Sequence, residues 1–90
     1  MITVQHLTGD EWQVTLKAGV TTHHRVRVTR ADVERFAAGR SVEDLLRESF
    51  RFLLEREPNT SILNSFDLPV INQFFPAYEE ETRQRLRAEC

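Results

Sequence analysis

Apolar and polar residues alternate with a period of two through most of the first 29 residues. Three runs show the alternation, over residues 2–6, 12–16 and 25–28, and Gly9 and Gly19 lie in the breaks between them. Such alternation, with many β-branched residues, is typical of half-buried strands. It predicts a three-stranded antiparallel β-meander with one apolar face, made by Ile2, Val4, Trp12, Val14, Leu16, Val26 and Val28.

The spacing of apolar residues changes to a helical period after Thr29. Capping-box patterns at 29–32 and 41–44 predict two helix starts, and Gly39 suits the end of the first helix. The second helix, over 41–57, carries apolar residues at i, i+3, i+4, i+7 and i+8. Phe52 and Leu54 widen that stripe, so we expect this helix to be sandwiched between the sheet and a further layer. Pro58 should end it.

Between residues 58 and 78 the only charged residue is Asp67. We expect Asp67 to cap a short helix with Pro69 in its first turn, and a last helix to cover 77–90. The chain is therefore predicted to be α+β, a single domain over 1–90. Its β-meander spans 1–29, and its helical part, 30–90, has three to four helices packed on one face of the sheet.

Composition excludes several classes of protein. With 90 residues, 40% hydrophobic and 29% charged, the chain fits a globular domain rather than a disordered one. A net charge of −2 argues against a dedicated nucleic-acid binder. Cys90 is the one cysteine, so no internal disulfide is possible, and we interpret it as a free thiol. No signal peptide and no membrane-length apolar run are present, which favours the cytoplasm and no membrane partner.

No pattern typical of catalysis is present. His23 and His24 are neighbours on a predicted strand and point to opposite faces. A site made of His6 and His24 would lack a third metal ligand at a motif spacing. The serines lie at caps, in turns or on a buried stripe, and three glycines form no phosphate loop. We therefore predict no enzyme, no metal and no cofactor, and a small metal-dependent or hydrolytic enzyme is the third alternative.

The outer face of the sheet is one of two candidate surfaces. In the predicted register it carries polar and basic side chains and no acid, a pattern that can bind phosphate backbones. Its candidate nucleic-acid-binding residues are Lys17, His23, Arg25 and Arg27. A nucleic-acid-contacting regulator using this face is the alternative function.

The second candidate surface is the apolar 58–78 segment. A three-stranded sheet offers limited area to bury so many large side chains, so the excess indicates a homodimer interface or a groove for a partner protein. The leading prediction is a non-enzymatic protein-binding or regulatory module. Its predicted interface residues are Phe66, Leu68, Ile71, Phe74, Phe75 and Tyr78.

The run from Ser49 to Pro58, followed by Ser61-Ile62-Leu63, Phe66-Asp67-Leu68 and Phe75-Pro76, resembles a group of short uncharacterised bacterial proteins. The resemblance covers roughly the C-terminal half. It implies a bacterial origin and no established activity, and it carries no functional residue over. The order of elements at the start, β-β-β-α, is also similar in outline to that of small antitoxin-type proteins.

Overall fold

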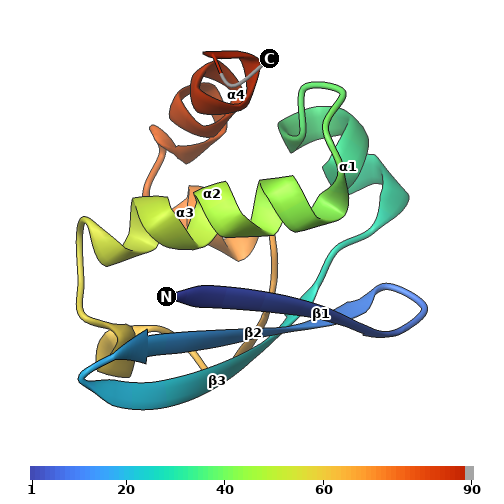
Figure 1. Cartoon of the computed structure of the whole chain (residues 1–90). Helices are drawn as coiled ribbons and strands as arrows, with labels where there is room; N and C mark the ends of the chain where they lie inside the picture. Colours follow the sequence, from blue (N-terminus) through green and yellow to red (C-terminus); the bar gives the residue numbers. More distant parts are fainter. Residues whose placement is uncertain (89–90) are drawn as a thin grey trace.

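A computed structural model describes residues 1–88 and shows an α+β fold in which one sheet lies beneath a stack of helices (Figure 1). The sheet begins with three antiparallel strands, β1 (Ile2–Thr8), β2 (Glu11–Ala18) and β3 (Val20–Arg27). The meander is therefore confirmed. So is its apolar face: Val14, Leu16, Val26 and Val28 are buried, and the other three predicted residues pack against them.

A fourth strand, β4 (Ser65–Asp67), corrects the predicted sheet. It pairs in parallel with β3, opposite Arg25, Val26 and Arg27, so the sheet is mixed with strand order β1-β2-β3-β4. Parallel neighbours require a long crossover, and here two helices supply it. The prediction that Asp67 caps a helix is wrong, because Asp67 ends this strand and the next helix has Pro69 at its N-cap position.

The predicted starts of the first two helices are confirmed. Helix α1 (Arg30–Phe36) has a full capping box between Thr29 and Asp32. Helix α2 (Val42–Leu54) is capped by the Ser41 side chain, which accepts from the backbone N–H of Asp44. After a single turn of 3-10 helix, η1 (Asn59–Ser61), and β4, the chain forms α3 (Val70–Phe74) and α4 (Tyr78–Ala88).

Helix α2 lies between the sheet and the other helices, as its broad apolar stripe predicts (Figure 1). Phe50 points to the sheet, where its ring centre lies 5.6 Å from that of His24. Phe52 points the other way, 5.5 Å from the ring of Tyr78 on α4. The two rings thus lie on opposite sides of one helix, within a single hydrophobic core.

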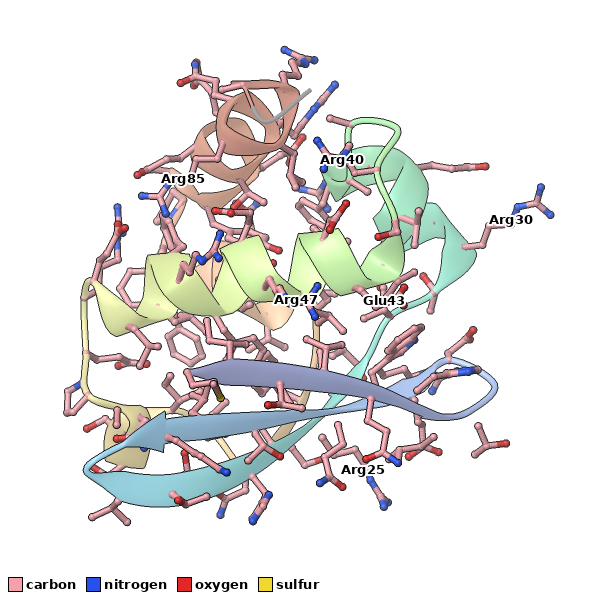
Figure 2. All side chains as sticks on the ribbon, in the orientation of Figure 1. Arg25, Arg30, Arg40, Glu43, Arg47 and Arg85 are labelled. Carbon is pink, nitrogen blue, oxygen red and sulfur yellow. The ribbon has the colours of Figure 1, made fainter. Side chains whose placement is uncertain are left out.

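Charged side chains join the end of α2 to α4. Arg85, labelled in Figure 2, lies 2.6 Å from Glu55 and 2.7 Å from Glu81. Arg56 pairs with Glu81 at 3.0 Å while its guanidinium stacks over the ring of Phe52. The hydrogen bond from Arg85 lowers the pKa of Glu55. These pairs tie the C-terminal end of α2 to α4, just before the chain turns away at Pro58.

Candidate binding groove

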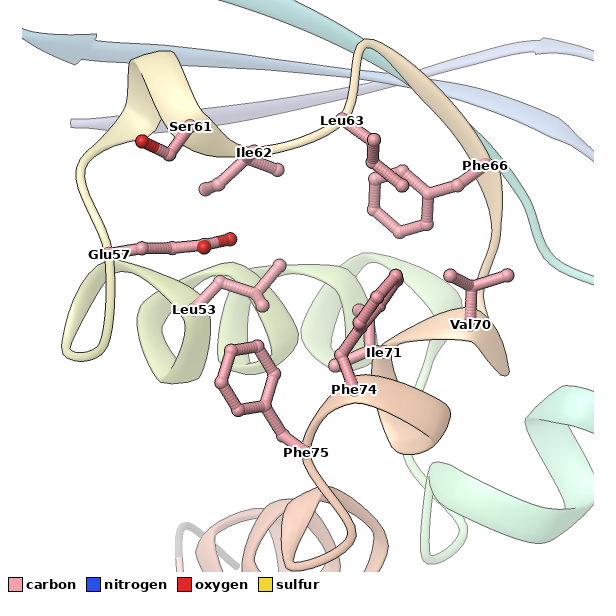
Figure 3. Close-up of a pocket in the computed structure, with 10 residues that line it drawn as sticks. All are labelled: Leu53, Glu57, Ser61, Ile62, Leu63, Phe66, Val70, Ile71, Phe74 and Phe75. Carbon is pink, nitrogen blue, oxygen red and sulfur yellow. The ribbon is translucent and has the colours of Figure 1, made fainter.

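An apolar groove of about 350 Å³ opens beside the C-terminal end of α2 (Figure 3). Three segments form it: the last turn of α2, the chain from η1 to β4, and α3 with the residue after it. Its volume falls within the range of sites that hold ligands, roughly 300–1,000 Å³. The lining residues are Leu53, Glu57, Ser61, Ile62, Leu63, Phe66, Val70, Ile71, Phe74 and Phe75.

Partly buried hydrogen bonds attach one wall of the groove to the sheet. The Leu63 carbonyl lies 2.7 Å from His24 Nδ1, and since a carbonyl can only accept, the ring nitrogen donates. The Asn59 amide donates to the Val20 carbonyl at 2.7 Å and to the Thr22 hydroxyl at 3.2 Å. That hydroxyl lies 2.9 Å from His24 Nε2. The loop that carries Leu63 is therefore attached to β3.

Aromatic contacts support the rest of the groove. The ring of Phe66, on β4, lies 6.1 Å from that of Phe50, and the ring of Phe75 meets Phe52 edge-on at 5.9 Å. These separations are typical of favourable aromatic pairs. Both walls are thus anchored to α2, through residues on its two opposite faces.

The structure divides the six predicted interface residues into two groups. Leu68, Ile71 and Tyr78 are buried in the core, although Ile71 also lines the groove. Phe66 and Phe75 are half-buried in the groove, and Phe74 is 68% exposed at its mouth. Leu63, which the sequence did not single out, is 50% exposed. The candidate surface is therefore smaller than predicted, and it includes residues from before β4.

Of the residues that the structure describes, Glu57 is the only charged one that lines the groove. Its side chain extends between Leu53 and Ile62, into the apolar opening (Figure 3). It is partly buried, and no hydrogen bond or ion pair joins its carboxylate to any side chain among residues 1–88. Its neighbour Arg56 is engaged elsewhere, with Glu81 and the ring of Phe52. The groove therefore combines apolar walls with one negative charge that lacks a counterion.

The outer sheet face is not the acid-free surface that the sequence predicts. Arg25 lies on the side away from the helices (Figure 2), 3.5 Å from Glu11, and Asp67 is the strand partner of Arg27. His23 Nδ1 lies 3.1 Å from the Thr15 hydroxyl. Lys17 and Arg27 are exposed. Acids from β2 and β4 thus interrupt the basic residues. They were not expected on this face, because neither strand β4 nor the start of β2 at Glu11 was predicted.

The histidines lie in separate environments. His24 is buried and fully engaged beside the groove, whereas His6 is exposed, with its ring 4.5 Å from Trp12 and its Nε2 2.8 Å from the Gly9 carbonyl. Strand β2 lies between them. Within residues 1–88, no three His, Cys, Asp or Glu side chains are grouped as metal ligands. Cys90 lies outside the described residues.

None of the helices within residues 1–88 has the length and apolar character that a bilayer crossing requires. Comparisons of the chain with protein-family models, with curated proteins and with solved structures found no match. The groove must therefore be interpreted from its own geometry and chemistry.

Proposed function

We propose that this protein is a non-enzymatic binding module whose apolar groove accepts a segment of another protein chain. The observation that carries the proposal is the exposure of Phe74, at 68%, and Leu63, at 50%, on either side of a groove with apolar walls. Large apolar and aromatic residues with few charges are the composition of the centre of a protein interface. Phe74 would act as the central anchor.

The expected contribution of Phe74 follows from its exposure. Complete burial of a phenylalanine side chain is worth about 1.5–3 kcal/mol. About two-thirds of that side chain is still in water, so covering it supplies about 1–2 kcal/mol. A partner that covers this ring would therefore lose roughly 5- to 30-fold in affinity when the ring is removed.

The test is selection of a phage-displayed random peptide library on the full chain. The proposal predicts enriched peptides with at least two large apolar residues, and binding that Phe74→Ser weakens by the factor above. Val20→Ser is the matched control, because Val20 is 61% exposed and does not line the groove. Circular dichroism checks that both variants fold. Peptides that bind Phe74→Ser as tightly as the original chain would refute the proposal.

A further inference from the structure

The chemistry of Glu57 specifies the occupant of the groove further. We infer that the groove accepts an apolar peptide segment of a different protein that carries a lysine or arginine placed to meet the Glu57 carboxylate. This inference rests on the proposed function, since it names the partner of the same groove. Its basis is charge complementarity between one unpaired acid and the apolar walls that surround it.

An occupant without a cation would bury Glu57 at a penalty. Covering the groove removes water from the carboxylate, and a buried charge without a counterion costs several kcal/mol. A lysine or arginine beside it replaces that water with a charge-assisted hydrogen bond, which is among the stronger polar interactions in proteins. The acid therefore favours segments with a cation and disfavours equally apolar segments without one.

The same charge argues against a second copy of this chain as the occupant. A two-fold symmetric pair places the same surface on both sides of the interface. The groove has Glu57 and no lysine or arginine among its lining residues, so two copies would bring together two acids and no cation. Arg56, the nearest cation in sequence, is held by Glu81 on α4 and by the ring of Phe52. A symmetric homodimer through this groove is therefore disfavoured.

The test selects the same random peptide library in parallel on the full chain and on Glu57→Gln. On the original chain we expect large apolar residues with lysine or arginine at a fixed spacing from them. On Glu57→Gln the apolar residues should remain while the basic position loses its preference. The best peptide should bind Glu57→Gln about tenfold more weakly. Glu43→Gln is the control, because this exposed acid lies at the opposite end of α2 and should leave binding unchanged.

A charge exchange provides a second variant. Glu57→Lys should reject the basic peptide and bind its counterpart with glutamate in place of the lysine or arginine. Phe74-dependent peptides with no basic preference, or with the same preference on Glu57→Gln, would overturn the inference and leave the proposed function standing. A concentration-dependent dimer that Phe74→Ser dissociates would also overturn it, in favour of a second copy. If no peptide depends on Phe74, the proposed function itself fails.

Discussion

Ser49 and Tyr78 form a buried hydrogen bond between α2 and α4, at 2.6 Å, and its energetics can be predicted atom by atom. The Ser49 hydroxyl donates its single proton to the Leu45 carbonyl, also at 2.6 Å. The Tyr78 hydroxyl must therefore be the donor to Ser49. Both side chains are fully buried, so water cannot replace a hydrogen bond that a substitution removes.

Ser49→Ala leaves the Tyr78 hydroxyl as a buried donor without an acceptor, at about 1–3 kcal/mol. Alanine has the higher helix propensity, which offsets about 0.5 kcal/mol. We therefore expect a net loss of about 1.5 kcal/mol. Tyr78→Phe removes the donor and leaves Ser49 bonded to Leu45, so it should lose about 1 kcal/mol. The double variant has neither group, and its loss should stay near 1 kcal/mol rather than reach the sum of about 2.5 kcal/mol.

The assay is urea unfolding at neutral pH with linear extrapolation, observed through the fluorescence of Trp12, the only tryptophan. The original chain, the two single variants and the double variant must show the same slope of unfolding free energy against urea concentration for the comparison to hold. If the two single losses add to within about 0.5 kcal/mol, the side chains are not coupled and the assignment of donor and acceptor is wrong.

The same tyrosine gives the protein an alkaline limit. Burial raises the pKa of the Tyr78 phenol, because it disfavours the charged form. A raised pKa in the folded state means that this contribution to stability is complete below the ordinary value of 10.0 and is lost as pH rises through the folded value. Tyr78→Phe should lack this decline. Because Tyr78 is the only tyrosine, tyrosinate absorbance should appear only on unfolding; ionisation of the folded protein near the ordinary pKa would contradict the expected burial.

Three further outcomes follow from the structure. Ile71→Ala should cost about 2–5 kcal/mol in urea unfolding while Phe74→Ala changes stability by less than about 0.5 kcal/mol, because the first side chain is buried and the second exposed; equal losses would place Phe74 in the core. Thr29→Ala should cost about 1 kcal/mol by removing the α1 capping box, measured by the same method. Because the pKa of Glu55 is lowered in the folded state, its ionised carboxylate stabilises the fold above pH 4.5, the ordinary pKa, and this stabilisation is lost as pH falls through the folded pKa. In Glu55→Gln the free energy of unfolding should therefore fall less steeply with decreasing pH; an unchanged pH dependence would contradict this.

Elements with long, regular patterns could be predicted from the sequence. The meander alternates over a run of four or five residues in each strand, and α2 repeats its apolar spacing over 13 residues. Strand β4 has three residues, too few to show a period, and tertiary pairing with β3 determines it. In sequence, Asp67 followed by Pro69 is typical of a helix start. In the structure Asp67 instead pairs with Arg27 at the end of β4, because tertiary pairing outweighs the local preference.

The candidate site could be predicted only in part. The apolar composition of 58–78 indicated more large side chains than the sheet can cover. Helix α3 is only five residues long, too short for its sequence to show a buried and an exposed face, so the sequence could not tell that Ile71 is buried and Phe74 exposed. Glu57 precedes a proline, and in sequence it marks nothing more than the end of a helix. Its position in the groove depends on where η1 and α3 pack, which is a matter of tertiary structure.

The parallel pairing of β4 with β3 has a consequence for the order of folding. The meander is built from neighbouring segments, whereas β4 joins β3 only after the 37 residues between Arg27 and Ser65 have been brought into place. Loop closure over such a distance is slow, and contacts formed late are commonly the first to open. We therefore expect amide hydrogens of β4 and α3 to exchange with solvent before those of β2 and α2. The segment that forms the groove would then be the least stable part of the fold, and an occupant would protect it.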